Sequence, residues 1–493
     1  MKRTKTALLL LTLLTVVSCQ SNAVFLRFEK EVVVKEFLTE TTDEYYLPNS
    51  YTKSYADILR SNPNAKYKER SLKSTGEQKI LVLPVLFPNY PLSNFDESAD
   101  GSESLINIEK AFFGVPENTS WESVASYYYT SSYGQLLLSG HVAPWYTLPE
   151  NYATTMLENR VNVSHDKVRE TTEIMKLALS NYAHSGGDLT AFDLDEDGYI
   201  DSVYVIYGYP YKANSEKSVF WAFAAYNQSN EGTVETPVAN MYAWSSYDFL
   251  KAEKQKPDAH TYIHEVGHLL GLVDYYNTNY REGYSPLGGF DMMDSTIGDH
   301  TGFSKMLLEW TYPKQIKKSA TLTLKPFSET GELFLLKNGW NESALDEYLL
   351  LEYYTPAALN EQDSRLNAEF KLPRRSGLKV YHVDARTEYK KGNDYVYTSE
   401  TEHAPNTLEV LAHSNTHGAR NGEYKLYSLL EPEESLNILE GGNANMHSLF
   451  TSNDDFGLTH FQDFTFNDGT KLDLGFKVKA VNADGITLEF SEI

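Results

Sequence analysis

The hydrophobic pattern divides the 493-residue chain into a polar leading part, a middle part of helices and strands, and a final part rich in strands. A continuous apolar run at residues 79–87 predicts a buried strand. Shorter apolar runs predict strands at 136–142, 202–209, 219–225 and 238–244. Apolar positions three and four residues apart predict helices at 103–113, 120–131, 165–183, 258–271 and 302–310.

Beyond residue 316 the pattern changes to short extended runs separated by polar turns. Strands are expected there at 321–324, 333–336, 348–353, 377–383 and 486–490. The predicted fold class is therefore α+β. A mixed twisted sheet with helices at 76–315 is followed by a β-sandwich-like C-terminal domain at 316–493. Residues 385–425 are polar and are expected to form a long surface loop.

The first 19 residues have the pattern of a bacterial export signal. Basic residues precede an apolar stretch at 7–17, which is too short to span a bilayer. The following Val16–Cys19 segment resembles a lipobox, in which Cys19 would be lipidated, and a plain cleavable signal peptide is the alternative. We expect a lipid-anchored lipoprotein on the extracellular side of a membrane. Residues 20–75 would form a tether or N-terminal extension, and whether it is a removable pro-segment stays open.

Charge and cysteine content narrow the class of protein further. The chain has 43 Lys and Arg against 68 Asp and Glu, which gives a net charge of −25 and argues against a nucleic-acid partner. Cys19 is the only cysteine, so the printed chain has no intramolecular disulfide and no cysteine-based latency switch. We expect a monomer whose partners, apart from the lipid anchor, are its substrates.

The strongest chemical signal is the pattern H-E-x-x-H-x-x-G-x-x-D at residues 264–274. Residues four apart share one face of a helix, so the imidazoles of His264 and His268 can bind one metal ion, most often zinc. Gly271 can adopt the left-handed conformation that ends a helix, and the turn can bring Asp274 back as a third ligand. A fourth position open to water is typical of a catalytic zinc site.

Within this motif Glu265 is placed to take a proton from zinc-bound water. The alternative is a solvated helix with two surface histidines. His260 lies one turn earlier and could be a third metal contact, but it is more simply interpreted as a neutral histidine beside the site or at the surface. Tyr284 and His300 follow the helix and are candidates for an oxyanion-stabilising donor. Other candidates for the third ligand are Asp291, Asp294 and Glu309.

A second metal motif, D-x-D-x-D-G-x-x-D, occupies residues 193–201. Alternating carboxylates with a glycine at the sharp turn favour calcium. Tyr204 stands where a complete EF-hand loop has a bidentate glutamate, so any further ligands would come from elsewhere, and a solvated acidic turn is the alternative. The expected structural calcium ligands are Asp193, Asp195, Asp197 and Asp201.

The loop-rich stretch at 286–294 contains Met292 and Met293 some 20 residues after the second histidine. A methionine turn would give a zinc site an apolar floor, and Met293 is the predicted floor residue. Two methionines in a loop are otherwise typical core filler.

Together these features resemble the immune inhibitor A-type secreted bacterial metallopeptidases, a metzincin-like family. The resemblance extends over about residues 76–493. Its motifs are the first strand at 79–87, S-V-x-x-Y-Y…S-x-G at 123–134, the acidic loop at 193–201, G-F-D-M-M at 289–293 and the strands at 348–353 and 377–383. The resemblance implies a zincin-type catalytic domain at 76–315 and hydrolysis of peptide bonds in proteins.

By the same resemblance His264 and His268 are zinc ligands, Glu265 is the general base and Asp274 is the third ligand. The usual metzincin third ligand is histidine, so Asp274 departs from that pattern. The expected function is that of a membrane-anchored, extracellular zinc endopeptidase. An inactive surface-binding lipoprotein on the same fold is one alternative, and a zinc hydrolase acting on a non-peptide bond is another.

Overall fold

The computed structural model describes residues 72–493 apart from several internal stretches. These are 213–217, 227–231, 240, 251–255, 278–282, 367–371, 392–393, 396–407, 411–414, 416–423 and 433–436. Everything described below belongs to one compact unit within Thr39–Ile493. The predicted signal peptide, Cys19 and nearly all of the extension at 20–75 lie outside the described residues. Within the described part, every helix is too short or too polar to cross a membrane.

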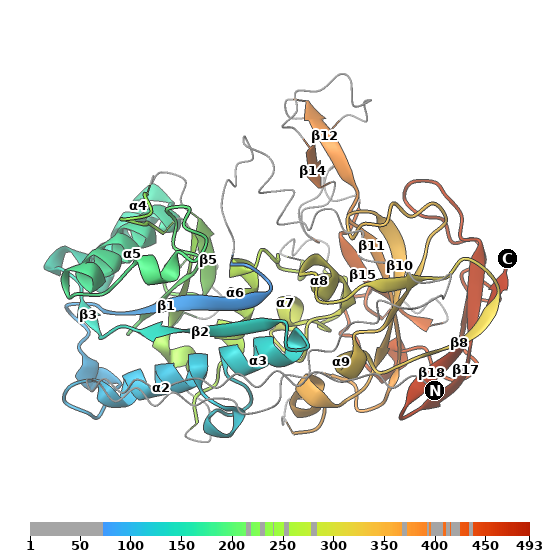
Figure 1. The fold of residues 1–493 in the computed structure, drawn as a ribbon, viewed down its shortest axis with the longest axis horizontal. Coiled ribbons are helices and arrows are strands. Elements are labelled where there is room, and N and C mark those ends of the chain that lie inside the picture. The colour runs from blue at the N-terminus through green and yellow to red at the C-terminus, as the bar shows by residue number, and fades with distance from the viewer. Residues whose placement is uncertain are drawn as a thin grey trace, which may run out of the picture. The chain divides into compact units, whose positions relative to one another are not determined.

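The part of the chain from β1 to α8 (residues 76–307), called the first half below, is built on a mixed six-stranded sheet (Figure 1). The strand order is β2-β1-β4-β6-β5, and β3 also pairs with β1. Its strands are β1 (Gly76–Leu86), β2 (Leu136–Val142), β3 (Tyr146–Thr147), β4 (Val203–Tyr207), β5 (Phe223–Tyr226) and β6 (Met241–Ser246). Strands β1, β2, β4 and β6 run parallel, and β5 pairs antiparallel with β6. Alternate residues of β1 pack into two different hydrophobic cores: Val82 lies in one and Leu83 lies in the other. Because both faces of the strand are buried, its apolar run is continuous.

Helices cover both faces of this sheet (Figure 1), with α4 and α5 on one side and α2 and α3 on the other. The longer helices are α2 (Ser102–Phe113), α3 (Val124–Ser131), α4 (Thr154–Ser164), α5 (Lys167–His184) and α6 (His260–Leu269). The shorter helices are α7 (Met292–Ser295), α8 (Gly302–Leu307) and α9 (Phe327–Thr330). This arrangement confirms the predicted mixture of helices and mixed sheet.

Several predicted boundaries were wrong for local reasons. Helix α3 begins at Val124 rather than at residue 120, because the Ser123 hydroxyl accepts a hydrogen bond from the Ser126 backbone N–H at 3.0 Å and caps the helix. Helix α4 was not predicted, because its weakly periodic sequence has only three buried residues. Strand β5 covers only the end of the expected run at 219–225, and Trp221 belongs to the turn before it.

The second half contains two larger sheets. A five-stranded sheet has the order β15-β11-β10-β9-β7, and a four-stranded sheet has the order β16-β17-β18-β8. The strands of the first are β7 (Pro313–Gln315), β9 (Leu333–Leu336), β10 (Glu347–Tyr354), β11 (Gly377–Asp384) and β15 (Tyr427–Leu430). Those of the second are β8 (Ala320–Leu324), β16 (Asp455–Phe456), β17 (Leu474–Asn482) and β18 (Gly485–Glu492). The expectation of a loop throughout 385–425 was wrong, because β12 (Thr387–Lys391) pairs with β13 (Asp394–Tyr395) and β14 (Leu408–Val410).

Strand β10 is buried on both faces, and its residues alternate between two cores. Leu349 packs in a core shared with the four-stranded sheet, whereas Leu350 packs in the core that contains the helices of the first half. At Gly302 in α8 an added Cβ would lie 2.8 Å from Leu333 and 3.0 Å from Leu350. One hydrophobic core therefore crosses the predicted boundary between residues 315 and 316, and that boundary stays a prediction.

Candidate metal centre

Helix α6 carries the two histidines, and its apolar face anchors it in the first half. Its buried apolar residues are Tyr262, Ile263, Val266 and Leu269. The N-cap is Ala259, so α6 begins at His260 rather than at residue 258, where the predicted helix begins. The Asp258 carboxylate instead accepts a hydrogen bond from the His260 backbone N–H at 2.9 Å, which satisfies one of the free donors at the helix start.

The turn after α6 returns the chain to the helix. Gly271 has a φ of 95°, a left-handed conformation that glycine adopts without strain. Oδ1 of Asp274 then lies 3.1 Å from Nε2 of His264 and 3.3 Å from Nε2 of His268. The structure thus brings together the three side chains that the motif singled out.

The distances between these donor atoms suit a zinc ion. Ligands at 2.0–2.1 Å from a tetrahedral zinc ion lie about 3.3 Å from one another, which matches both contacts. Nδ1 of His264 lies 2.8 Å from the Met292 carbonyl oxygen, and Nδ1 of His268 lies 2.9 Å from the Leu272 carbonyl oxygen. These carbonyls require the proton to be on Nδ1, so both Nε2 lone pairs face the shared centre.

Two other candidates for the third ligand have different contacts. Asp291 caps α7 by accepting a hydrogen bond from the Met293 backbone N–H, and its other oxygen accepts one from Thr301. Asp294 accepts hydrogen bonds from the Ser285 hydroxyl and the Gly289 backbone N–H. Among the described residues, neither these two aspartates nor Glu309 joins the cluster of donor atoms around the histidines.

The three side chains form a strongly coupled electrostatic cluster without an ion. Burial opposes ionisation of Asp274, but the two imidazoles outweigh it and hold the pKa of this carboxyl well below its usual range. Burial also opposes protonation of His268, yet the nearby Asp274 raises its pKa to about 9. The pKa of His264 is raised for the same reason. A divalent cation would replace this proton as the partner of the carboxylate.

Glu265 is buried beside the cluster, with 4% of its surface exposed. Its Oε2 atom is fully enclosed and has no hydrogen-bond partner among the described residues. Burial raises the pKa of Glu265, while the neighbouring histidines act in the opposite direction. A buried carboxylate oxygen without a partner fits a group whose proton-transfer partner is a solvent molecule or a substrate.

Met293 packs against α6 between the two histidines. A Cβ atom added to Gly267 would lie 2.5 Å from the Met293 Sδ atom, so the helix lies directly on the sulfur. The segment is a short helix, α7, rather than the expected loop, because Asp291 caps it. The role of Met293 as the floor of a metal site stays a prediction.

Two of the surrounding histidines differ from expectation. Burial disfavours the charge of His260, but a hydrogen bond to Asp258 and the Asp363 carboxylate 3.6 Å away outweigh it and raise its pKa to about 9, so the expectation of a neutral histidine does not hold. Its ring stacks on Trp121 at 4.2 Å between centroids. His300 is 1% exposed, and burial lowers its pKa well below the usual value. Its enclosed position among aromatic rings makes it unsuitable as an oxyanion donor.

The acidic loop is also formed, but with three carboxylates rather than four. Asp193, Asp195 and Asp197 place oxygen atoms close together, and Gly198 has a φ of 88° that permits the turn. Asp201 is not part of this group. One of its oxygens accepts the Leu194 backbone N–H at 2.9 Å, and burial raises its pKa to about 6.

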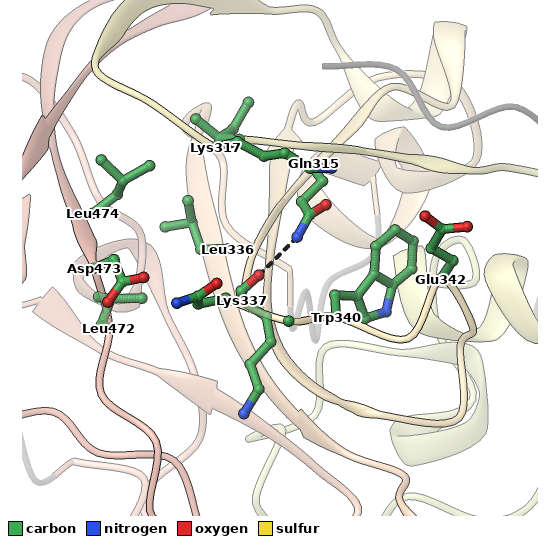
Figure 2. Close-up of a pocket in the computed structure, with 12 residues that line it drawn as sticks. Gln315, Lys317, Leu336, Lys337, Trp340, Glu342, Leu472, Asp473 and Leu474 are labelled. Atoms are coloured by element: carbon green, nitrogen blue, oxygen red, sulfur yellow. Dashed lines mark hydrogen bonds between the residues drawn. The ribbon is translucent and has the colours of Figure 1, made fainter. Parts of the chain in front are cut away.

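Two cavities lie in the second half. One of about 260 Å³ is bordered by Trp340 and Leu474, and Figure 2 shows Gln315 donating a hydrogen bond to the Lys337 carbonyl beside it. The Lys337 ammonium group is paired with Asp468, so it is not available to a ligand. The other cavity, of about 620 Å³, lies along β15. Residues of the metal cluster line neither cavity.

Sequence reasoning missed the two carbonyl oxygens that orient the histidines. A backbone carbonyl carries no residue-type signal, so the Leu272 contact is visible only in the folded turn. The capping role of Asp291 had a usable signal, because aspartate is a preferred N-cap residue before a short helix.

The described residues thus form an α+β structure in which one helix carries two of the three candidate metal ligands. Residues 77–311 match the family model described as the immune inhibitor A peptidase M6 catalytic domain. This part of the chain is therefore similar to the immune inhibitor A family of peptidases.

Comparisons with individual proteins matched a curated relative and a solved structure. Immune inhibitor A of Bacillus thuringiensis subsp. alesti is 22% identical over 451 residues, which cover 83% of this chain and 62% of the relative. The chain thus spans less than two thirds of that relative's length. A crystal structure of catalytically inactive OgpA from Akkermansia muciniphila, in complex with an O-glycopeptide substrate, is 12% identical. The match covers 67% of this chain and 93% of that one, with a TM-score of 0.19.

Proposed function

We propose that this protein is a zinc-dependent endopeptidase that hydrolyses peptide bonds in proteins. The observation that carries the proposal is the meeting of His264, His268 and Asp274 beside the buried, unpartnered oxygen of Glu265. Two imidazoles and one carboxylate are a donor set that zinc hydrolases use, because three protein ligands leave a position for water or substrate. The family match of residues 77–311 supports a peptide rather than another bond as the target.

A zinc ion held by these three side chains would polarise the scissile carbonyl and lower the pKa of a water molecule towards about 7. The carbonyl oxygens of Met292 and Leu272 hold the imidazole rings in the orientation that binding requires. Glu265 accepts the proton of the attacking water and delivers it to the leaving amine. Burial raises the pKa of Glu265, which makes the carboxylate a stronger base towards the proton of the water.

The finer fold assignment belongs to the same proposal. A metzincin-like catalytic domain is supported by the Gly271 turn and by Met293 packed against Gly267. A β-sandwich-like C-terminal part is supported by the core that the five-stranded and four-stranded sheets share.

The proposal also includes the setting of the enzyme. The export signal and the lipobox ending at Cys19 support a lipid-anchored protein on the extracellular side of a membrane. The clustered oxygens of Asp193, Asp195 and Asp197 support a structural calcium ion.

Glu265→Gln in the full chain, purified in detergent, tests the mechanism. Zinc content should stay at the level of the unsubstituted protein, while casein hydrolysis falls by about 10²–10⁴-fold, the usual contribution of a general base. Glu173→Gln is the matched control, because Glu173 is an exposed glutamate on α5 that pairs with the nearby Lys176. Full activity of Glu265→Gln would rule out the mechanism.

The two alternatives give different results in the same assays. An inactive surface-binding protein would bind zinc but would not hydrolyse casein, and adding a chelator would not change the casein result. A zinc hydrolase of another bond would leave casein intact but cleave ester or glycoside substrates in a chelator-sensitive way.

A further inference from the structure

Asn415 lies in the second half, far along the chain from the metal centre, yet its side chain is in contact with the segment of the third ligand. The residue is fully buried, and its amide is hydrogen-bonded at both ends. Nδ2 donates to the carbonyl oxygens of Tyr275 and Tyr427, each at 2.8 Å, and Oδ1 accepts from the Tyr427 backbone N–H at 2.9 Å. The side chain therefore pairs with the outer edge of β15 as a neighbouring strand would.

Tyr275 directly follows Asp274, so its peptide groups determine where the Asp274 carboxylate lies. The Tyr275 backbone N–H donates to the Met293 carbonyl oxygen at 2.9 Å, and its carbonyl accepts from Asn415. Its side chain is fully buried, with the hydroxyl 2.9 Å from the Ser304 Oγ atom. Both backbone polar groups of Tyr275 are thus held, one by the α7 segment and one by Asn415.

The same contacts close into a ring of buried hydrogen bonds. From Met293 the ring continues through Asp291, which accepts the Met293 N–H at 2.6 Å and the Thr301 hydroxyl at 2.6 Å. The Tyr427 hydroxyl reaches the Thr301 Oγ1 atom at 2.9 Å, and Asn415 leads from Tyr427 back to the start of the ring. A closed buried network resists displacement of any one member, because moving it leaves several polar groups unpaired.

We propose that Asn415 is a positioning residue for Asp274. It links the five-stranded sheet to the segment that carries the proposed third metal ligand. Without the amide, the Tyr275 carbonyl and the backbone N–H and carbonyl of Tyr427 would each lose the hydrogen bond that Asn415 makes to them. The turn after α6 would then be free to relax, and the Asp274 carboxylate would lose its fixed distance to the histidines. This inference rests on the metal centre of the proposed function, but not on the bond that is hydrolysed.

The test compares Asn415→Ala and Asn415→Asp with the unsubstituted full chain. Aspartate keeps the shape of the side chain and an acceptor for Tyr427, but it has no donor for the Tyr275 carbonyl. The measurements are the zinc dissociation constant by chelator competition, the visible spectrum of the cobalt(II)-substituted protein, and the thermal midpoint without metal. We expect zinc affinity to fall about tenfold or more, as for other groups that orient a metal ligand, and the cobalt spectrum to change.

Asn360→Ala is the matched control. Asn360 is also a buried asparagine of the second half, but its amide contacts the Thr355 carbonyl and the Asp299 N–H. This variant should lose thermal stability while its zinc affinity and cobalt spectrum stay unchanged. The inference is overturned if both Asn415 variants bind zinc with the original affinity and spectrum, or if neither folds, since Asn415 would then have only a structural role.

Failure of the proposed function would look different. An unsubstituted chain that takes up no zinc would remove the metal centre itself. If the unsubstituted chain binds zinc but cleaves no peptide, the proposed peptidase activity is wrong, while the proposed effect of Asn415 on zinc affinity still holds.

Discussion

Met293 packs so closely against Gly267 that a Cβ atom on Gly267 would lie 2.5 Å from the Met293 Sδ atom and 3.1 Å from its Cε atom. Gly267→Ala should therefore force the methionine or the helix to move. We expect a loss of about 1–3 kcal/mol in the free energy of unfolding, as for other overpacked cores, together with weaker zinc binding. Chemical denaturation and zinc titration measure the two effects.

The double variant Gly267→Ala/Met293→Ala isolates the cause of that loss. Shortening Met293 removes the clash, so the alanine at 267 should cost less in this background than alone. An equal cost in both backgrounds would show that the methionine is not what excludes a side chain at 267.

The identity of the third ligand can be tested by substituting the two nearby aspartates separately. Asp274→Ala should weaken zinc binding more than about 100-fold, because even outer partners of metal ligands contribute 10–100-fold. Asp294→Asn should change zinc affinity much less, since Asp294 bonds to Ser285 and Gly289. The reverse ranking in a chelator competition would assign the ligand to Asp294.

His260 links stability to pH. Its Nδ1 lies 2.7 Å from Asp258 and its Nε2 lies 3.6 Å from Asp363. Its pKa is raised from 6.5 to about 9, so the folded state binds the proton more tightly than the unfolded state. The resulting stabilisation is complete below pH 6.5, is lost as the pH rises to about 9, and amounts to about 3 kcal/mol at most.

His260→Gln should flatten the decline in unfolding free energy between pH 6.5 and 9. His184→Gln is the control, because His184 is an exposed histidine whose contacts are with Ser180 on the same helix. Urea denaturation at several pH values measures the slopes, and an unchanged decline in the His260 variant would contradict the assignment.

Calcium binding at the acidic loop should appear as added thermal stability. Calcium at 100 times its dissociation constant would add about 2.7 kcal/mol to the free energy of unfolding if only the folded state binds it. Asp195→Asn should reduce this gain, because it removes one charge from the cluster, whereas Asp188→Asn, at an exposed carboxylate outside the cluster, should retain it. A thermal midpoint that does not respond to calcium in the unsubstituted chain would leave the loop as an acidic turn.

Local sequence patterns determined much of the fold. The strands predicted at 136–142 and 333–336 agree with β2 and β9 to the residue, because each is a short apolar run between clear turn signals. Helix α4 escaped prediction because few of its residues are buried, which leaves little periodicity to detect.

For the metal centre, the sequence by itself determined the two histidines on one helical face, the glutamate beside them and the glycine that turns the chain. Each depends on spacing within a few residues, which helix geometry converts directly into position. Only the tertiary structure decided the orientation of the imidazoles by Met292 and Leu272, the raised pKa of His260 and the contact of Asn415 with Tyr275. These depend on groups brought together by packing, and no local spacing encodes which distant carbonyl or carboxylate will lie there.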